Sequence, residues 1–326
     1  MEDNFGRRID YLRLSVTDRC NLRCRYCMPE EGVAPLDHGQ ILSYEEMLRV
    51  AAVAVRLGVS KIRVTGGEPL VRKGLVGFIG HLAALTPAPE VTLTTNGLRL
   101  ADMAADLRRA GLSRINVSLD TLRPERFERI TRRSGLEQVL AGLKAAEAAG
   151  LSPLKLNMVP IAGENADEII DFARLTLEHP WEVRFIEFMP VSGGLSYGEE
   201  NRFPAASIVA ELQRLGPLEA IARQGPAGPA RLYRYAGGLG RIGVIPAVSE
   251  HFCSECNRLR ITADGRIRPC LFSTEELDLR RLLRSGAGDG ALEQLLLQAI
   301  GVKPERHRIG EADFVQGARR MQEIGG

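Results

Sequence analysis

Residues 19–27 read Arg19-Cys20-Asn21-Leu22-Arg23-Cys24-Arg25-Tyr26-Cys27, and the three cysteines follow the spacing C-x3-C-x2-C. Three thiolates hold a cubane iron–sulfur cluster but leave one iron without a protein ligand, whereas an electron-carrying cluster or a structural metal site normally closes with a fourth. Another molecule can bind at the open iron. The loop follows a β-rich run, Tyr11–Val16, so we expect it at the carboxyl edge of a sheet, where α/β proteins place their active sites.

The remaining three cysteines form a second triplet, Cys253, Cys256 and Cys270, with the spacing C-x2-C-x13-C. This triplet also lacks a fourth thiolate, and two open irons in one chain indicate a redox enzyme that coordinates small molecules directly. Zinc is the alternative metal for such a triplet, but a zinc site usually includes a fourth Cys or His ligand nearby. For the first triplet the nearby His38 is separated by a loop that contains Pro and Gly.

The composition argues against several other classes of protein. The 326 residues carry a formal net charge of +2, so overall charge favours neither a nucleic acid nor a membrane as partner. No stretch approaches the roughly 18 apolar residues of a transmembrane helix. The first ten residues are polar and charged, unlike a secretory signal. Clustered cysteines in a large, core-rich chain are typical of reduced thiols, so we expect the cytoplasm as location.

Over the first two thirds of the chain, β-rich runs alternate with amphipathic segments, which predicts a parallel sheet with right-handed crossovers. The predicted strands are Tyr11–Val16, Lys61–Thr65, Val91–Thr94, Arg114–Leu119, Leu154–Val159 and Val183–Phe188. The predicted helices are Tyr44–Leu57, Gly74–Leu85, Leu100–Ala110, Leu136–Ala149, Ala166–Leu177 and Ala205–Leu215. Six units are two short of a closed eight-stranded barrel. We therefore predict an α/β fold, a partial (β/α)6 TIM-like barrel, with a doubly wound open sheet as the alternative.

Alternation along these strands predicts a hollow barrel. The residues that share one face are Arg13, Ser15 and Thr17; Lys61, Arg63 and Thr65; Thr92 and Thr94; Asn116, Ser118 and Asp120; Lys155 and Asn157; and Arg184. A filled barrel carries Val, Ile and Leu inside, so this polar face should line a cavity. Its cations suit a polyanion such as a nucleoside triphosphate. The alternatives are solvated edge strands, or pairing of the cations with Asp18, Asp120 or Glu187.

From about Gly193 the elements become shorter. The predicted strands are Leu232–Tyr235, Arg241–Ile245, Leu259–Thr262 and Arg266–Arg268, and the predicted helices are Leu277–Arg284, Ala291–Ile300 and Glu311–Glu323. We divide the chain into residues 1–220, the partial barrel with the first triplet, and residues 221–326. The second part is predicted to be an α+β extension that carries the second cluster, closes the barrel and ends in Gly325-Gly326.

Two segments resemble the radical S-adenosylmethionine (SAM) superfamily: the loop at residues 19–27, and Thr65-Gly66-Gly67-Glu68-Pro69, which is similar to its segment for the SAM amino group. Three C-terminal segments closely resemble one family within it, the GTP 3′,8-cyclases of molybdenum cofactor biosynthesis. They are residues 252–260 (FCSECNRLR), residues 268–272 (RPCLF) and the diglycine tail at residues 321–326. The resemblance runs from Tyr11 to Gly326.

The resemblance implies roles for individual residues. Cys20, Cys24 and Cys27 would hold a first [4Fe–4S] cluster that chelates SAM, and Cys253, Cys256 and Cys270 a second whose open iron takes the guanine base. The implied SAM contacts are Tyr26, Gly67, Ser118 and Met189. The implied GTP contacts are Arg13, Arg63, Thr94, Lys155, Arg258, Leu259 and Arg260, with Lys61 and Arg184 as further phosphate ligands. The implied catalytic residues are Arg258 and Arg260, which stand beside the second cluster, and Gly325 and Gly326. The two glycines are included because the tail is expected to reach the active site.

The resemblance also implies the reaction and its partners. A 5′-deoxyadenosyl radical derived from SAM would remove the ribose 3′-hydrogen of GTP, and C3′ would couple to guanine C8. The product of this lyase would be (8S)-3′,8-cyclo-7,8-dihydroguanosine 5′-triphosphate. The implied partners are a flavodoxin- or ferredoxin-like electron donor and the cyclic pyranopterin monophosphate synthase that receives the product. We expect a monomer or homodimer, and neither nucleic acid nor membrane as partner.

Two other functions remain open from the sequence. One is a two-cluster radical SAM enzyme that modifies peptides, although a peptide does not call for a cationic cavity of triphosphate size. The other is a non-catalytic metal-binding regulator with zinc in both triplets. His307 has no convincing partner in the sequence, and we expect it to be structural or on the surface.

Overall fold

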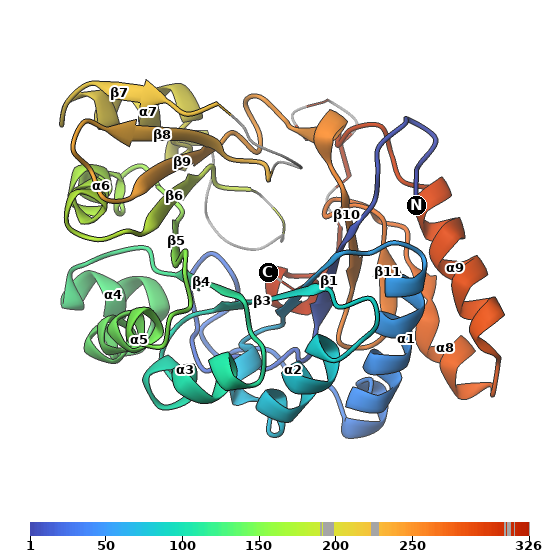
Figure 1. The fold of residues 1–326 in the computed structure, drawn as a ribbon. Helices are drawn as coiled ribbons and strands as arrows, with labels where there is room; N and C mark the ends of the chain where they lie inside the picture. The colour runs from blue at the N-terminus through green and yellow to red at the C-terminus, as the bar shows by residue number, and fades with distance from the viewer. Residues whose placement is uncertain are drawn as a thin grey trace.

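The computed structural model describes residues 1–326 apart from 190, 192–198, 223–227, 310, 312–313, 316 and 326. Six parallel strands follow one another in sequence order across the middle of a 12-stranded sheet (Figure 1). They are β1 (Tyr11–Ser15), β2 (Lys61–Thr65), β3 (Glu90–Thr95), β4 (Arg114–Ser118), β5 (Lys155–Met158) and β6 (Glu182–Ile186). A doubly wound sheet reverses its strand order at a switch point. The unbroken order therefore confirms the partial barrel and excludes the doubly wound alternative.

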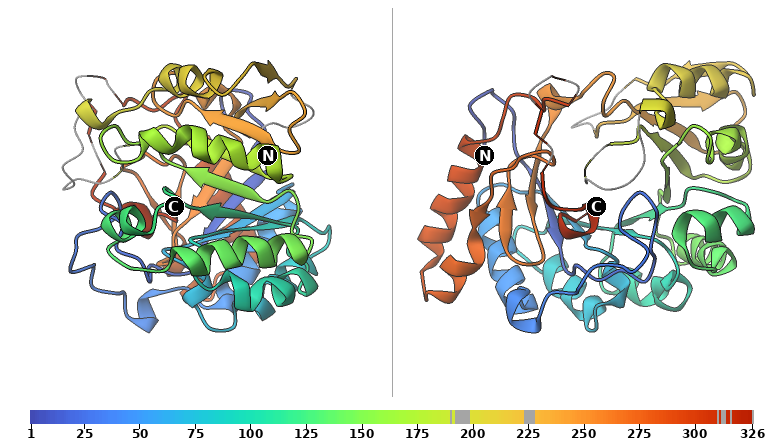
Figure 2. Two further views of the ribbon diagram at one scale, coloured as in Figure 1. Left: turned by 90° about the vertical axis from the view of Figure 1, so that its left-hand side faces the viewer. Right: turned by 180° about the vertical axis from the view of Figure 1, so that it is seen from behind.

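The predicted helices of this region are present on the outer side of the curved sheet, as the two views in Figure 2 show. They are α1 (Tyr44–Arg56), α2 (Leu75–Ala83), α3 (Leu100–Arg109), α5 (Leu136–Ala148), α6 (Ile169–Glu178) and α7 (Ala205–Gln213). Ser43 caps α1, since its hydroxyl accepts a hydrogen bond from the N–H of Glu46 at 3.1 Å. One further helix, α4 (Pro124–Thr131), was not predicted.

The alternation along the strands separates the core from the inside of the barrel. Leu12, Leu14, Ile62 and Val64 are fully buried in the hydrophobic core, which is the apolar face predicted to pack on the helices. The alternating polar residues lie on the other face. Burial of each such aliphatic side chain contributes about 1.5–3 kcal/mol relative to exposure, so this alternation fixes which face points inward.

The C-terminal region adds strands to both edges of the sheet. At the β6 edge lie β9 (Arg241–Ile245), β8 (Arg231–Tyr235) and β7 (Leu218–Ala220), and at the β1 edge lie β10 (Arg258–Ile261), β11 (Arg266–Arg268) and β12 (Leu277–Asp278). β9 is parallel to β6 and β10 is parallel to β1, so both continue the parallel part of the sheet. Strands from before and after residue 220 thus belong to one sheet. The division of the chain at residue 220 stays a prediction.

Two helical predictions in the C-terminal region need correction. The helix predicted at Glu311–Glu323 is wrong, because its described residues contain only the short 3-10 helix η6 (Met321–Glu323). Arg319 forms ion pairs with Asp264 at 2.8 Å and Glu276 at 2.7 Å, and these tertiary contacts override the local helical pattern. The segment predicted as a helix at Leu277–Arg284 begins with β12 and continues as α8 (Leu279–Arg284).

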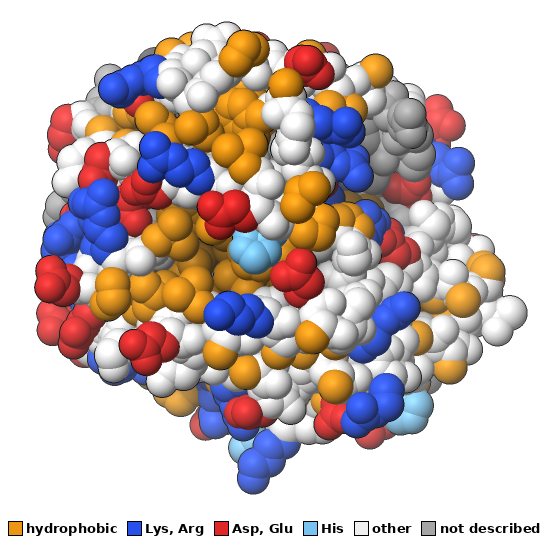
Figure 3. Space-filling model, turned by 60° about the vertical axis from the view of Figure 1, so that its left-hand side comes forward, with side chains coloured by type: hydrophobic (Ala, Val, Ile, Leu, Met, Phe, Trp, Pro, Cys, Tyr) orange, Lys and Arg blue, Asp and Glu red, His pale blue; other side chains and the backbone are white. Residues whose placement is uncertain are grey.

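The remaining elements are α9 (Asp289–Gly301), which packs on α1, and five short 3-10 helices. The latter are η1 (His38–Gln40), η2 (Pro69–Val71), η3 (Ala166–Glu168), η4 (Glu199–Asn201) and η5 (Cys253–Glu255). Among the described residues, no helix is both long and apolar enough to cross a lipid bilayer. On the face drawn in Figure 3, cationic and anionic side chains are interspersed around apolar patches and a hollow.

Candidate active site

All six cysteines line one cavity of about 480 Å³ inside the barrel. The first triplet enters it on the loop after β1, and the second on η5 and on the residue that follows Pro269 after β11. Two triplets more than 220 positions apart in the sequence thus meet at one hollow. The polar strand face lies in the same wall. It contributes Arg13, Lys61, Arg63, Thr65, Thr94, Asn116, Ser118, Asp120, Lys155, Asn157 and Arg184.

Most residues predicted for the site line this cavity. In addition to the residues above, Tyr26, Gly67, Met189, Arg258 and Arg260 do so. Leu259 differs, because its side chain is 2% exposed and belongs to the hydrophobic core. Only its backbone is therefore left for a substrate contact. Ser15, Thr17 and Thr92 share the predicted face but are buried in the structure and are not part of the cavity wall.

The diglycine tail enters the barrel as far as it is described. Gly325 is buried, and its carbonyl accepts a hydrogen bond from the guanidinium of Arg13 at 3.2 Å. Its φ of +80° favours glycine, and a Cβ there would lie 2.9 Å from Cβ of Ser15 and 2.7 Å from Oγ1 of Thr65. Gly326 lies outside the described residues, so its predicted role is not addressed by the structure.

The first cysteine triplet is tightly folded. The N–H groups of Cys27 and Met28 both donate to the carbonyl of Cys24, at 2.9 and 3.1 Å, and the N–H of Leu22 donates to the sulfur of Cys20 at 3.4 Å. Burial raises the pKa of Cys20 to about 11. Burial, then repulsion from Cys27 and Cys20, raises the pKa of Cys24 well above the ordinary value. Three mutually repelling sulfurs need a nearby positive charge to become thiolates, and cluster iron supplies it.

The second triplet has a more cationic environment. Burial alone would raise the pKa of Cys256, but the positive charges of Arg258 and Lys303 lower it to about 6. Burial raises the pKa of Cys253. Arg258 lies with its guanidinium 4.8 Å from the ring centroid of Phe252, a cation–π contact that keeps it beside the triplet. The residues around this triplet therefore already stabilise one thiolate.

The donor set of both triplets fits [4Fe–4S] clusters. Among the described residues, no group of three His, Cys, Asp or Glu side chains that could hold a single metal ion is found. A cubane differs from a single-ion site because it places a separate iron against each thiolate. The donor chemistry, three sulfurs in each triplet, suits a cluster with one open iron.

The segment after β2 is packed against the start of the first cluster loop. The N–H of Gly67 donates to the carbonyl of Thr17 at 2.6 Å, and a Cβ at this position would lie 2.4 Å from the carbonyl oxygen of Arg19. Only glycine allows this approach. Because the N–H of Gly67 is used, its carbonyl is the backbone group available to a ligand amino group. Burial raises the pKa of the next residue, Glu68, to about 7, although that carboxyl accepts a hydrogen bond from the N–H of Asn96 at 2.6 Å.

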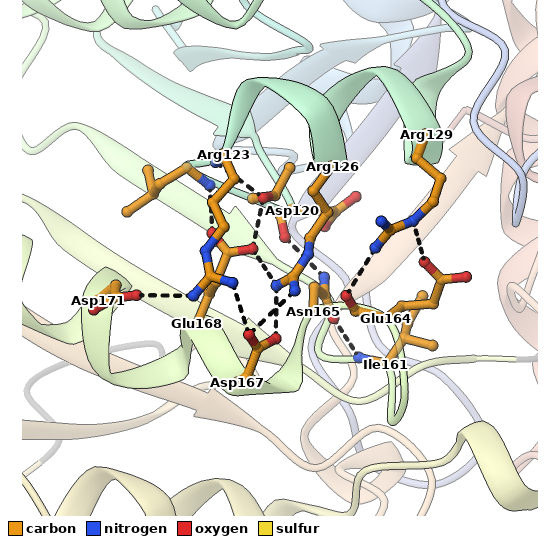
Figure 4. Close-up of polar contacts among 12 residues, drawn as sticks. Asp120, Arg123, Arg126, Arg129, Ile161, Glu164, Asn165, Asp167, Glu168 and Asp171 are labelled. Carbon is orange, nitrogen blue, oxygen red and sulfur yellow. Dashed lines mark hydrogen bonds and ion pairs between the residues drawn. The ribbon is translucent and has the colours of Figure 1, made fainter.

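Helix α4 supports the first cluster loop. The N–H groups of Arg23 and Arg25 donate to the carbonyls of Thr131 and Ile130, both at 2.9 Å. At the other end of the helix, Arg126 pairs with Asp167 at 2.6 Å and with Glu168 at 2.5 Å. Figure 4 shows these pairs together with Asn165, whose side-chain amide donates to the carbonyl of Asp120 at 2.8 Å. The network thus connects α4 to Asp120, whose carboxylate accepts a hydrogen bond from the hydroxyl of Tyr26.

Several cations line the same cavity. Burial, only partly offset by Tyr11, lowers the pKa of Arg63 to about 10. Arg260 is 8% exposed, and its Nη1 atom is buried with no hydrogen-bond partner. An unmet buried guanidinium nitrogen is costly, and an anion bound in the cavity would compensate it. Tyr11 lies in the middle of this group, with its ring centroid 5.4 Å from Nζ of Lys61 and 5.6 Å from Cζ of Arg63.

Two carboxylates, the half-buried Glu90 and the buried Glu182, orient other cations of the wall. Lys61 pairs with Glu90 at 3.0 Å, and Lys155 pairs with Glu182 at 3.0 Å, in both cases directly across neighbouring strands. Arg184 also pairs with Glu182 at 2.5 Å. The sequence analysis considered three other carboxylates as ion-pair partners of these cations, and the described contacts show that this was wrong. Asp18, Asp120 and Glu187 accept hydrogen bonds from backbone N–H groups of Leu36, Val159 and Ala205, respectively.

Several residues of the site were missed or given another role in the sequence analysis. Tyr11, Lys303, His307 and Gln322 line the cavity. His307 was expected to be structural or on the surface, and its imidazole lies 3.0 Å from the carbonyl of Ala247 in the cavity wall. Tyr11 could have been found, because it shares the period-two face with Arg13. Lys303 follows a helix, and no sequence signal points to it.

A parallel barrel with an open thiolate triplet after its first strand and a Gly-Gly-Glu segment after its second defines a radical SAM enzyme. Residues 14–176 match the model of the radical SAM superfamily, and residues 181–309 match the model described as Molybdenum Cofactor Synthesis C. The chain is 50% identical over 324 residues to the GTP 3′,8-cyclase of Geobacter sulfurreducens, with 99% of each chain covered. It is 48% identical over 332 residues to that of Heliobacterium modesticaldum, with 100% of each covered. The chain belongs to the GTP 3′,8-cyclase family.

A solved structure agrees on the fold. Streptococcus suis SuiB bound to S-adenosylmethionine matches with a TM-score of 0.62 at 15% identity, over 88% of this chain and 68% of that one. At this identity the likeness concerns the architecture alone. The family membership, in contrast, rests on nearly the whole length of both chains.

Proposed function

We propose that this chain converts GTP to (8S)-3′,8-cyclo-7,8-dihydroguanosine 5′-triphosphate, the first step of molybdenum cofactor biosynthesis. Its relatives are named for this activity. The observation that carries the proposal is that both cysteine triplets line one cavity, together with the cationic strand face. A cofactor held at one triplet and a triphosphate held by the cations can thus meet in a single enclosed space. Neither a peptide modifier nor a zinc regulator requires that arrangement.

One end of the cavity would bind SAM. Cys20, Cys24 and Cys27 would hold a [4Fe–4S] cluster, which together with bound SAM would supply the 5′-deoxyadenosyl radical for removal of the ribose 3′-hydrogen. The carbonyl of Gly67 would accept a hydrogen bond from the SAM amino group. Ser118, the last residue of β4, and Met189, which follows β6, line the cavity and would contact the rest of the cofactor.

The other end would bind GTP. Arg13, Arg63 and Lys61 come from neighbouring strands β1 and β2, and Lys155 and Arg184 from β5 and β6, so the triphosphate would lie against the strands. Thr94 would add a hydroxyl. Cys253, Cys256 and Cys270 would hold the second [4Fe–4S] cluster with its open iron towards the guanine base. Arg258 and Arg260 alternate on β10 and would lie beside the base and the phosphates.

The tail would complete the wall of the reaction space. Gly325 bonds Arg13 and packs on Ser15 and Thr65, so a residue with a side chain would not fit there. A primary carbon radical reacts with most groups it meets, and a wall without mobile side chains protects it. We assign Gly325 and Gly326 this role of closing the site and fixing Arg13.

The cellular setting follows from the same chemistry. Reductive chemistry at two clusters needs an electron donor, which we propose to be flavodoxin- or ferredoxin-like. The product would pass to cyclic pyranopterin monophosphate synthase. Six cysteines that must stay reduced favour the cytoplasm. The chain would act as a monomer or a homodimer.

The experiment that tests the proposed function is anaerobic incubation with SAM, a strong reductant and one nucleotide at a time. With GTP, 5′-deoxyadenosine should form together with the cyclised nucleotide. ATP is the matched control because it carries the same triphosphate on another base, and it should give neither product. Formation of 5′-deoxyadenosine at the same rate without GTP would assign another substrate to the site. Colourless protein that contains zinc in place of about eight irons per chain would exclude the enzyme altogether.

A further inference from the structure

Lys303 lies at the centre of the segments that carry the second triplet. Its side chain is buried, with 4% of the residue exposed, and it lines the cavity. Its ammonium donates hydrogen bonds to the carbonyl of Arg258 at 3.0 Å and to the carbonyl of Pro269 at 2.7 Å. Cys256 lines the same cavity, and the positive charge of Lys303 is one of the causes that lower its pKa.

The two acceptors belong to two segments that carry ligands of the triplet. Arg258 begins β10, two residues after the predicted ligand Cys256, and Pro269 directly precedes the predicted ligand Cys270. A single side chain therefore ties the backbone after Cys256 to the backbone before Cys270. Lys303 is itself held in place, because its N–H donates to the carbonyl of Ile300 at 3.1 Å, in the last turn of α9.

The N-terminal segment holds the chain that follows Lys303. The guanidinium of Arg7 donates to the carbonyls of Cys253 and Glu305, both at 2.8 Å, and to the carbonyl of Pro304 at 2.7 Å. Arg7 is fixed in turn by a buried ion pair with Asp3 at 2.6 Å. The backbone on each side of Lys303 is thus tied down, by α9 before it and by Arg7 after it.

The charge of Lys303 is unusual for a buried site. No ion pair between Lys303 and a carboxylate occurs among the described residues, although a buried ammonium is costly unless a counter-charge compensates it. Its hydrogen-bond partners are two neutral carbonyl groups. The site therefore keeps a buried cation in the wall of the cavity that the second triplet lines.

We propose that Lys303 is a positioning residue for the second cluster, which ties the segment after Cys256 to the segment before Cys270 and stabilises the additional negative charge of the reduced state. A cation beside a cluster favours the reduced state and raises the reduction potential. This rests on the proposed function only in that the second triplet holds an iron–sulfur cluster; it does not depend on GTP as substrate.

The test measures the midpoint potential of the second cluster in the full chain. A background in which Cys20, Cys24 and Cys27 are replaced by alanine leaves the second triplet as the source of the signal. In this background Lys303→Met should retain the cluster but shift its midpoint potential to a more negative value in an anaerobic titration followed by electron paramagnetic resonance. Lys303→Arg keeps the cation and should stay closer to the parent. Lys73→Met removes a charge at an exposed position and is the matched control, with the parent's potential expected.

The two Lys303 variants together keep the proposal open to refutation. If Lys303→Met has the midpoint potential of the parent and of Lys73→Met, the proposal is wrong. If Lys303→Met loses the iron of the second cluster and Lys303→Arg retains it, the cation is required and the proposal is supported. If both Lys303 variants lose the iron of the second cluster equally, the shape of the lysine side chain matters and its charge does not. That result would also refute the proposal. Because no nucleotide is added, failure of GTP turnover leaves this test unaffected.

Discussion

The hydroxyl of Tyr26 donates a hydrogen bond to a carboxylate oxygen of Asp120, and so connects the first cluster loop to the residues after β4. The other carboxylate oxygen accepts the N–H of Val159 at 2.9 Å, next to β5. Burial raises the pKa of Asp120, whereas these two hydrogen bonds stabilise its ionised form. The loop that would hold the first cluster is thereby fixed relative to the barrel strands.

This contact predicts that Tyr26→Phe weakens SAM binding. Loss of a hydrogen bond to a buried carboxylate costs about 1.5–3 kcal/mol, so the dissociation constant of SAM should rise roughly ten- to hundredfold. Titration of SAM into the reconstituted variant measures this. Tyr235→Phe is the matched control, because its buried hydroxyl bonds the carbonyl of Leu212 at 2.8 Å away from the cavity wall. A normal SAM affinity for Tyr26→Phe would show that the contact does not position the loop.

Arg260→Ala should weaken GTP binding and spare SAM binding. Its unmet buried Nη1 atom suggests a charge-assisted bond to the nucleotide, worth about 1.5–3 kcal/mol. The dissociation constant of GTP should therefore rise roughly tenfold or more, and the same direction holds for Arg258→Ala. Arg266→Ala, on the neighbouring strand and paired with Asp278 at 2.8 Å, should leave GTP binding unchanged. Loss of the first cluster in Arg260→Ala would contradict the assignment of the two ends of the cavity.

Gly325→Ala should remove most of the turnover while the protein stays folded. A left-handed φ costs a non-glycine residue about 1 kcal/mol, and the new Cβ would also clash with Ser15 and Thr65. The tail should therefore leave its position beside Arg13. Gly237→Ala has a similar φ of +73° but nothing within 4 Å of the new Cβ, so it separates backbone strain from the clash. Turnover and thermal midpoint are the measurements, and equal turnover in the two variants would argue against a role of the tail.

Tyr11 should make GTP binding dependent on pH. Burial alone would raise its pKa, but Arg63, Arg13 and other nearby cations lower it from 10.0 to about 8. The stability that this lowering contributes is fully present above pH 10 and is lost as the pH falls through about 8. A triphosphate repels the phenolate, so GTP should bind the protonated form and bind more weakly as the pH rises above about 8, by at most about tenfold per pH unit.

Two measurements check the Tyr11 prediction. The ultraviolet absorbance of phenolate should appear near pH 8 in the free protein and shift upward when GTP is present. Tyr11→Phe should remove the pH dependence of GTP affinity in that range. An unchanged pH profile in Tyr11→Phe would mean that another group is responsible.

Much of the site could be predicted because strands have a simple period. Side chains two residues apart share a face, so Lys61 and Arg63, or Asn116 and Ser118, identify the inner wall without any tertiary information. The order of the strands also follows from alternation with helices. The position of the second triplet opposite the first could not be predicted from strand periodicity. It depends on the pairing of β10 with β1, which joins Tyr11 to Arg258 in register.

The missed features share a physical cause. Lys303 and Arg7 act through carbonyl groups of distant segments, and backbone carbonyls leave no mark in a sequence. The pattern of residues 311–323 suggested a helix, but Arg319 forms ion pairs with Asp264 and Glu276, and the described residues of this range contain only η6. Helix α4 was missed because it is short, although Pro124 at its first turn followed by Glu125 is a typical start signal.

The most direct test of the account uses GTP deuterated at the ribose 3′ position. If SAM at the first triplet and GTP at the second share one cavity, the deuterium should appear in 5′-deoxyadenosine after a single anaerobic turnover, in step with formation of the cyclised nucleotide. 5′-Deoxyadenosine that lacks deuterium, formed while the label stays in GTP, would show that the two ends of the cavity do not act on one another.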